Sequence, residues 1–311
     1  MKPALVVAGS LNMDFVVSVD HLPAPGETVL GSDFQMIPGG KGANQAAAAA
    51  KTGAGAVTVR MAGRVGYDVF GDHLKASLAA AGVDVSAVWA TRSQPTGVAL
   101  IWVDRQGQNS IVVASGANHA FAAKEVEGLR ATFRGAAVAL FQLETPLDTV
   151  EAALALARQE GIRTVLDPAP ARAVSRQLLE QVDILTPNES EACILLGRPA
   201  GRVRPEDCAE LARALLAMGP RAVVLKLGEL GCYYSDGSEE IRSPGFRVEA
   251  VDTTAAGDTF NGALAVAIAE GRPIADALRF ANAAAALSVT RMGAQTSIPA
   301  RAEVEALLEK P

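Results

Sequence analysis

Residues 251–264 read Val-Asp-Thr-Thr-Ala-Ala-Gly-Asp-Thr-Phe-Asn-Gly-Ala-Leu. Upstream of this stretch, apolar and polar side chains alternate over residues 246–251, and this alternation predicts a strand. Downstream, apolar side chains recur at helical spacing from Phe260 until Gly271 ends the pattern. The stretch is therefore predicted to join a strand to a helix, with Asp258 at the N-terminus of that helix.

The start of this predicted helix has the character of an anion site. The first backbone N–H groups of a helix lack intrahelical partners, and the helix dipole adds partial positive charge there. Ala255, Ala256 and Gly257 are small enough to let a phosphate approach the backbone closely. Asp258 would then be a carboxylate beside a phosphate, which suits proton acceptance from an alcohol during phosphoryl transfer. The alternative is that Asp258 only caps the helix.

Composition excludes several classes of protein. The chain has 311 residues, of which 50% are hydrophobic and 20% charged, so a large folded core is expected. Its net charge is −6 and it has no basic run, which argues against nucleic acid as a partner. The 3 cysteines are too few and too far apart for a disulfide framework or zinc cluster. With no signal-type pattern and no membrane-length apolar run, we expect a soluble cytoplasmic protein.

Short apolar runs alternate with helical patterns along most of the chain. Strands are predicted at residues 4–8, 57–62, 136–143, 164–166, 183–185 and 222–227. Strands that alternate with helices form a parallel sheet covered on both faces. The sequence thus predicts an α/β fold of three layers, α/β/α, with a mainly parallel central sheet.

Other β-like segments do not fit this rhythm. They lie at residues 15–19, 28–30, 34–37, 97–103 and 109–114, and Asp-Arg-Gln-Gly joins the last two as in a hairpin. We expect insertions at about 14–38 and 95–115 to form a small separate β-sheet on a single catalytic domain of residues 1–311.

Two polar side chains follow the first predicted strand. Asn12 and Asp14 come directly after the apolar run 4–8. In open α/β sheets, ligands bind outside the carboxyl ends of the strands. An amide and a carboxylate supply the donor and acceptors that the vicinal hydroxyls of a sugar require. An Asx turn is the alternative interpretation.

A glycine-rich turn opens the next predicted helix. Residues 39–46 read Gly-Gly-Lys-Gly-Ala-Asn-Gln-Ala, but a P-loop would need Gly where Gln35 stands and Ser or Thr where Gly42 stands. The glycines instead let the backbone approach a small polar ligand, with Lys41 and Asn44 as hydrogen-bonding groups. Plain turn chemistry is the alternative.

Later strand ends carry further polar residues. Glu144 follows the strand 136–143, where a surface role is the alternative to ligand binding. Asn188 and Glu191 begin a predicted helix and can be its cap and first-turn residues. Residues 226–231 read Lys-Leu-Gly-Glu-Leu-Gly, which has too few glycines for a dinucleotide fingerprint, and a strand is predicted after them.

Together these motifs resemble a known family. Residues 252–262 are similar to the C-terminal signature of the ribokinase-like (PfkB) carbohydrate kinases, and the resemblance extends from Gly9 to Pro299. The turn at 39–44 resembles the sugar-binding glycine pair of that family, and Asn188-x-x-Glu191 its Asn-x-x-Glu motif. The resemblance implies ATP-dependent phosphorylation of D-ribose at its 5-hydroxyl, giving ribose 5-phosphate and ADP. It also implies Mg²⁺ with the nucleotide and K⁺ as a monovalent activator.

The resemblance further implies which residues form the site. Asp258 is the implied base, its pKa depressed by the helix end, and the implied anion hole consists of Ala255, Ala256 and Gly257. The implied sugar contacts are Asn12, Asp14, Gly40, Lys41, Gly42, Ala43, Asn44, Glu144 and Asp258. The implied contacts of the nucleotide and its Mg²⁺ are Asn188, Glu191, Lys226, Leu227, Gly228, Glu229, Leu230, Gly231, Gly257, Asp258 and Asn282. The implied K⁺ ligands, mostly through main-chain oxygens, are Asp252, Thr254, Ser288, Arg291, Gly293 and Ser297.

The small sheet has an implied role as well. In the family it is a lid over the sugar site, and the lids of two subunits pack together, so a homodimer is expected. Other acceptors remain open, namely 2-deoxyribose, fructose or a nucleoside such as adenosine, although aromatic residues at 5% offer little for stacking a nucleoside. An inactive sugar-binding module on the same fold is the alternative from a different class.

Overall fold

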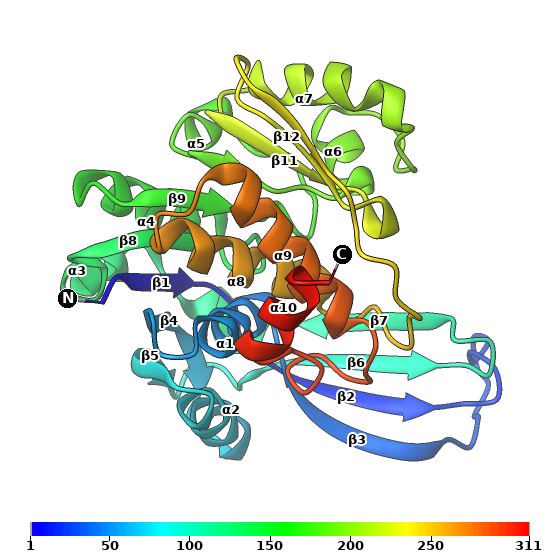
Figure 1. Cartoon of the computed structure of the whole chain (residues 1–311). Coiled ribbons are helices and arrows are strands. Elements are labelled where there is room, and N and C mark those ends of the chain that lie inside the picture. The colour runs from blue at the N-terminus through cyan, green and yellow to red at the C-terminus, as the bar shows by residue number, and fades with distance from the viewer. Residues whose placement is uncertain (1, 311) are drawn as a thin grey trace.

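Two β-sheets organise the computed structural model, which describes residues 2–310 (Figure 1). The strands of the larger sheet are β1 (Ala4–Ala8), β4 (Thr58–Gly66), β5 (Val83–Thr91), β8 (Ala136–Phe141), β9 (Arg163–Leu166), β10 (Ile184–Leu185), β11 (Ala222–Lys226), β12 (Cys232–Ser235) and β13 (Glu240–Ser243). They lie side by side in the order β13-β12-β11-β10-β9-β8-β1-β4-β5. Neighbours from β11 to β5 are parallel, and β12 and β13 add an antiparallel edge.

Helices cover both faces of this sheet. One face packs against α1 (Lys41–Gly53), α2 (Val69–Ala80), α8 (Ala256–Ala269), α9 (Ile274–Ser288) and α10 (Arg301–Leu308). The other packs against α3 (Arg130–Phe133), α4 (Leu147–Gln159), α5 (Arg176–Leu179), α6 (Glu189–Leu195) and α7 (Cys208–Leu216). Short 3₁₀ turns complete the chain: η1 (Gly116–Ala120), η2 (Ala123–Leu129), η3 (Pro205–Asp207) and η4 (Gly228–Leu230). The predicted three-layer α/β/α fold with a mainly parallel sheet is confirmed.

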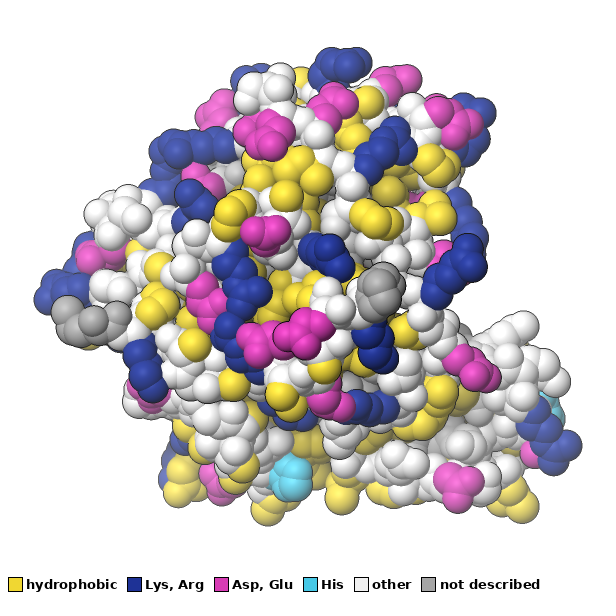
Figure 2. Space-filling model, in the orientation of Figure 1, with side chains coloured by type: hydrophobic (Ala, Val, Ile, Leu, Met, Phe, Trp, Pro, Cys, Tyr) yellow, Lys and Arg dark blue, Asp and Glu magenta, His cyan; other side chains and the backbone are white. Residues whose placement is uncertain are grey.

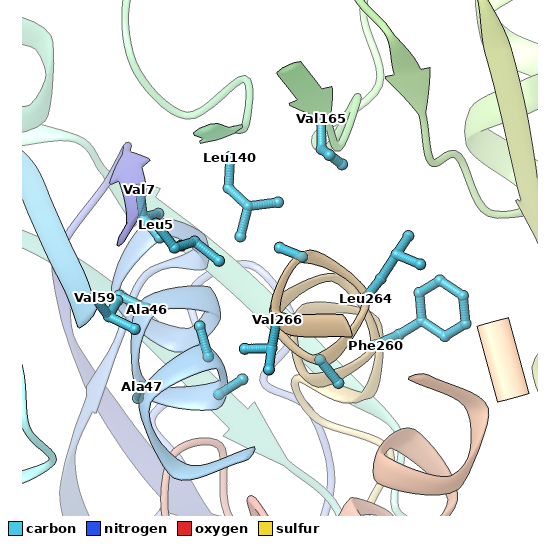
Figure 3. Packing of buried hydrophobic residues seen from close by; sticks show 14 of the residues in the cluster. Leu5, Val7, Ala46, Ala47, Val59, Leu140, Val165, Phe260, Leu264 and Val266 are labelled. Carbon is cyan, nitrogen blue, oxygen red and sulfur yellow. The ribbon is translucent and has the colours of Figure 1, made fainter. Parts of the chain in front are cut away.

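The interior strand β1, which lies between β8 and β4, shows why the sheet needs helices on both sides. Leu5 and Val7 point into the core under α1 and α8, while Val6 points into the core on the opposite face. Successive side chains of a strand alternate between faces, so an uninterrupted apolar run buries both. Figure 3 shows Leu5 and Val7 together with Val266 of α8 in one of these two cores.

The smaller sheet projects from the edge of this body (Figure 1). Its strands are β2 (Asn12–Ser18), β3 (Ser32–Gly39), β6 (Gly97–Val103) and β7 (Asn109–Ala114), in the order β3-β2-β6-β7. β2 pairs antiparallel with β3 and parallel with β6, while β6 and β7 form an antiparallel pair. Residues 9–11 alone separate β1 from β2, so the small sheet starts at the carboxyl end of an interior strand of the large one.

Some predicted elements differ from the structure. Residues 246–251 are not a strand: the backbone N–H groups of Val251 and Asp252 donate to the carbonyl of Val289 at the end of α9. Val248 and Val251 are exposed, so their alternation does not mark a buried face. The β-like segment 28–30 is also outside any strand. Conversely, β5, β13 and α10 were not predicted.

The surface carries both signs of charge. Figure 2 shows acidic and basic side chains interspersed over the face of the molecule toward the viewer. None of the helices within residues 2–310 combines the length and the apolar character that crossing a bilayer requires.

Candidate active site

Asp258 lies in the first turn of α8, with its side chain turned toward α1. The helix begins after Ala255, which has left-handed backbone geometry (φ 57°) and no capping side chain, so Asp258 is not the cap. Asp258 is only 7% exposed. Its Oδ2 accepts a hydrogen bond from Asn44 Nδ2 at 3.1 Å, and its Oδ1 accepts one from Gln45 Nε2 at 3.0 Å. The capping interpretation is therefore wrong, since the carboxylate faces the neighbouring helix.

The first turn of this helix leaves its backbone open at Gly257. A Cβ added to Gly257 would meet only Lys226 Nζ, at 3.4 Å, and the φ of Gly257 is not positive. Neither packing nor backbone geometry therefore demands glycine here, although glycine is unfavourable in a helix. Lys226 Nζ is itself held 2.9 Å from Asp167 Oδ1. The amine of Lys226 therefore lies beside the backbone N–H groups of the first turn of α8, and an anion can approach both.

The charges around Asp258 determine its titration. Burial is the largest effect on the pKa of Asp258 and raises it; Lys41 lowers it, Asp167 raises it, and the bonds from Gln45 and Asn44 lower it, with a net pKa of about 6. The predicted depression of the pKa is therefore wrong, because loss of hydration outweighs the favourable helix end. A carboxyl group with this pKa is still mostly ionised at neutral pH, as a proton acceptor must be.

Lys41 lies among the same carboxylates. Burial opposes its positive charge, but the charges of Asp258, Asp167 and Glu144 raise its pKa above the ordinary value. Its backbone N–H donates to Glu144 Oε2 at 3.1 Å. Lys41 is thus held as a cation at the N-terminus of α1, close to Asp258.

Asn12 and Asp14 lie in the first part of β2, so neither forms the Asx turn considered above. Asn12 Oδ1 accepts a hydrogen bond from Asn118 Nδ2 at 2.8 Å. A Cβ on Gly39, the first glycine of the predicted turn, would lie 2.1 Å from Asp14 Oδ2. That glycine therefore makes room for the carboxylate. Burial, together with the charge of Glu144, raises the pKa of Asp14 to about 7.

Two further glycines shape the start of α1. Gly40 has φ 89°, which favours glycine, and a Cβ on Gly42 would lie 2.6 Å from the backbone N of Ser10. The hydroxyl of Ser10 donates to Glu144 Oε2 at 2.5 Å. Glu144 is thus bonded to both the carboxyl end of β1 and the start of α1, and the alternative of a free surface side chain is wrong. Ala43 continues this contact by donating its N–H to the carbonyl of Ser10.

Asn188 and Glu191 form the cap of α6. Asn188 Oδ1 accepts from the Glu191 N–H at 2.8 Å, and Glu191 Oε2 accepts from the Asn188 N–H at 2.8 Å. The cap interpretation is confirmed, and it does not exclude a second role. The backbone of Asn188 also forms an isolated parallel β-bridge with that of Lys226. Burial raises the pKa of Glu191, whereas the charge of Lys226 lowers it. The pair therefore belongs to the same charged cluster as Asp167 and Lys226.

The predicted nucleotide loop is a tight 3₁₀ turn between β11 and β12. The N–H of Leu227 donates to the carbonyl of Gly231 at 2.8 Å. Gly231 has φ 90°, and a Cβ there would lie 2.2 Å from the carbonyl oxygen of Ser243. Asn282 on α9 donates to the carbonyl and hydroxyl of Ser243, both at 3.0 Å. Asn282 is thereby brought to the loop that contains Gly228, Glu229 and Leu230.

Two segments of the implied potassium site meet at Asp252. Its Oδ1 accepts from the N–H and hydroxyl of Thr254 at 2.9 and 2.6 Å, and its Oδ2 accepts from the Gly293 N–H at 2.8 Å. Although burial opposes it, these bonds lower the pKa of Asp252.

The other implied potassium ligands lie nearby in the sequence but have separate side-chain partners. Arg291 pairs with Glu303, the Ser288 hydroxyl donates to the carbonyl of Ala285, and that of Ser297 donates to the carbonyl of Ala294. Their main-chain oxygens remain the candidates for a cation, and oxygen donors suit a hard ion. Among residues 2–310, no three His, Cys, Asp or Glu side chains are grouped to hold a metal.

Several residues of the site were not predicted from the sequence. Asp167 directly follows β9, so the criterion that identified Asn12 and Asp14 would have found it. Gln45 and Gln142 form hydrogen bonds within the site that no motif indicates. Asn118, which holds Asn12, comes from η1 and becomes a neighbour only through the fold.

Comparisons with known proteins agree with one another. The family model described as pfkB family carbohydrate kinase matches residues 2–301. The chain is 44% identical over 308 residues to the ribokinase of Bacillus subtilis, covering 98% of this chain and 99% of that protein. It is 43% identical over 310 residues to the ribokinase of Haemophilus influenzae, covering 99% of each. A solved structure of Arabidopsis thaliana ribokinase complexed with ribose and ATP matches with a TM-score of 0.91 and 35% identity, covering 100% of both chains.

Proposed function

The chain belongs to the pfkB family of carbohydrate kinases, and we propose that it transfers the γ-phosphoryl group of ATP to the 5-hydroxyl of D-ribose. The observation that carries this proposal is the position of Asp258. Its carboxylate lies in the first turn of α8, within hydrogen-bonding distance of Asn44 and beside the open backbone at Gly257. The identity to ribokinases over nearly the whole chain supports ribose as the acceptor.

In the proposed reaction Asp258 accepts the proton of the sugar hydroxyl as that oxygen attacks phosphorus. The pKa of about 6 makes Asp258 a weak base, which suffices when the transition state is loose and the proton leaves late. The N–H groups at the start of α8 and the amine of Lys226 collect the negative charge of the transferring group. Lys41 adds a second cation close to the base.

The sugar is proposed to bind between the start of α1 and the first part of β2. Asn12, Asp14 and Glu144 supply an amide and two carboxylates, all held by neighbours or by the space left at Gly39. Carboxylates accept hydrogen bonds from hydroxyl groups, so this set matches a small polyol. Gly40, Gly42 and Ala43 bring the backbone of the turn close to the same place.

We also propose two cations. Asn188 and Glu191 would hold Mg²⁺, because a half-buried carboxylate next to Lys226 is an oxygen donor of the kind this ion prefers. Bound there, Mg²⁺ would supply neutralising charge for the ATP phosphates. Main-chain oxygens of the segments that Asp252 ties together would hold K⁺, whose charge would bias the anion turn without contact to the sugar.

We propose a homodimer formed through the small sheet. Several apolar side chains on it are exposed, including Phe34 at 62% and Met36 at 57%. Strand pairing puts Met36, Leu100 and Val112 on one side of the sheet, since Phe15 lies opposite Met36 and Leu100, and Leu100 opposite Val112. A contiguous apolar face of this kind commonly marks a protein interface.

An assay of ADP release over several acceptors tests the proposed function. Ribose, 2-deoxyribose, fructose and adenosine would each be offered with MgATP, with and without K⁺. We expect ribose to give the highest kcat/KM and K⁺ to raise it, with ribose 5-phosphate identified as the product. A higher kcat/KM for another acceptor would contradict the choice of ribose, and no ADP release with any acceptor would contradict the kinase activity.

A further inference from the structure

Gln45 connects two carboxylates of the site through one amide group. It lies on α1 and is fully buried, and no role was predicted for it although it falls in the glycine-rich stretch 39–46. Its Nε2 donates to Asp258 Oδ1 at 3.0 Å and to Asp167 Oδ2 at 2.9 Å. Its two N–H groups are thus both used, each by a different carboxylate.

The orientation of this amide is fixed from both ends. Ionised carboxylates only accept hydrogen bonds, so the nitrogen of Gln45 must face Asp258 and Asp167. The oxygen of Gln45 accepts from Gln142 Nε2 at 2.7 Å. Gln142 fits there because residue 9 is glycine: a Cβ on Gly9 would lie 1.9 Å from Gln142 Oε1. A flipped Gln45 amide would bring its oxygen against two negative charges and its nitrogen against another donor.

This geometry has consequences for the carboxylate of Asp258. One oxygen is held by Asn44 and the other by Gln45, so the plane of the carboxylate is defined by donors on separate residues of α1. Asp167, the second partner of Gln45, holds Lys226 through its other oxygen. A single buried side chain therefore links Asp258 to the amine that lies beside Gly257.

We propose that Gln45 is a positioning residue for phosphoryl transfer: it orients Asp258 and keeps it ionised by placing shared donors between Asp258 and Asp167. This inference rests on the proposed function of Asp258 as the base. Without Gln45, two buried carboxylates would face each other with no donor between them. The charge of Lys41 and the bonds from Gln45 and Asn44 lower the pKa of Asp258 against the effects of burial and of Asp167.

The test compares Gln45→Met and Gln45→Glu with the unaltered enzyme. Methionine is similar in size but has no donors, and glutamate adds a third acidic group. The measurement is kcat at saturating ribose and MgATP from pH 5 to 9. Because the base must be ionised, kcat falls on the acid side. We expect that acid limb to move to higher pH by about one unit in Gln45→Met, because the variant loses one charge-assisted hydrogen bond to Asp258. The limb should move further in Gln45→Glu.

Thr164→Val is the matched control for a purely structural loss. Thr164 is also fully buried, and its hydroxyl donates to the carbonyl of Gln181 at 2.8 Å, at the opposite end of β9 from Asp167. This variant should melt at a lower temperature and keep the acid limb of the unaltered enzyme. Acid limbs that coincide in Gln45→Met, Gln45→Glu and Thr164→Val would overturn the inference, provided that the unaltered enzyme phosphorylates ribose. If the unaltered enzyme does not, the proposed function itself fails.

A second route avoids replacing Gln45. Gln142→Met removes the donor that fixes the oxygen of Gln45 and leaves both of its carboxylate partners in place. Hydrogen bonds in a chain strengthen one another, so the bond to Asp258 should weaken. We expect the acid limb to rise by less than in Gln45→Met. An unchanged limb would overturn the inference even if neither Gln45 variant folds.

Discussion

At the scale of single residues, the proposed role of Asp258 opposes stability. The role requires an ionised carboxylate, whereas burial favours the protonated form. Its carboxylate is nearly buried, and burial raises its pKa to about 6 from an ordinary value of 3.8. A raised pKa in the folded state means that the protonated group favours folding. That stabilisation is complete below about pH 3.8 and is lost as the pH rises through about 6.

Asp258→Asn should therefore change how stability depends on pH. The variant has no carboxyl group at this position, so it lacks this loss. We expect its free energy of unfolding to gain on that of the unaltered protein by about 2 kcal/mol between pH 4 and pH 7.5. Urea denaturation at several pH values measures the difference. A difference that stays constant over this range would show that Asp258 does not titrate as the structure indicates.

Single residues also show what the sequence could predict. Asn12, Asp14 and Glu144 could be chosen as candidates because they follow predicted strands, a position that the apolar runs alone reveal. The predicted direction of the pKa shift of Asp258 was wrong, because the helix end is visible in the sequence whereas the burial of the side chain is not. Gln45 was missed because its partners lie 122 and 213 residues away in the chain.

At the scale of elements, α8 contains two glycines with different surroundings, Gly257 in its first turn and Gly262 farther along the helix. A Cβ at Gly257 has room, since its only neighbour is Lys226 Nζ at 3.4 Å. A Cβ at Gly262 would lie 2.6 Å from Ala48 Cβ and 2.7 Å from the carbonyl oxygen of Gln45. In the proposed site the first glycine would keep space for a ligand, while the second lets α8 pack closely against α1.

Substitution by alanine should distinguish these two roles. Gly257→Ala should melt at the same temperature as the unaltered enzyme or above it, while kcat/KM for ATP falls roughly 10-fold to 100-fold because the phosphate no longer reaches the backbone. Gly262→Ala should lose about 1–3 kcal/mol of stability through overpacking. Melting curves and initial rates check both. Full activity in Gly257→Ala would argue against the anion turn.

Strands could be predicted from the sequence where both of their faces are buried. The continuous apolar runs of β1, β8 and β11 were predicted as strands and are strands. Alternating segments were less reliable: residues 246–251 alternate but contact the end of α9, whereas β5 alternates at the sheet edge and pairs with β4. Local pattern is the same in both cases, and only the fold decides which segment finds a neighbouring strand.

At the scale of the whole molecule, the small sheet remains partly uncovered. Phe15 packs edge-on against Phe70 of α2, so one end of the sheet is anchored to the body. In the same cross-strand row as Phe15, Met36 and Val112 are exposed at 57% and 53%. Its strands could be predicted as short β-like segments, the last two joined as in a hairpin, but their common apolar side becomes visible only when the register is known.

If a second copy covers this side, charge on it should separate the subunits. We expect the unaltered protein to sediment as a dimer and Met36→Glu as a monomer, because a carboxylate cannot be buried unpaired in an apolar interface. Ile194→Glu, at a residue that is 39% exposed on α6, is the matched control and should remain dimeric. A dimer for all three proteins would place the interface elsewhere, and a monomer for all three would exclude a dimer.

The most direct test of the whole account measures steady-state kinetics of Asp258→Asn with ribose and MgATP. The variant keeps the size of the side chain and removes its ability to accept a proton as a carboxylate. We predict that kcat falls by roughly 10²-fold to 10⁴-fold while KM for ribose stays within about threefold of the original value. Turnover at the unaltered rate would contradict the account, because Asp258 would then have no part in the transfer.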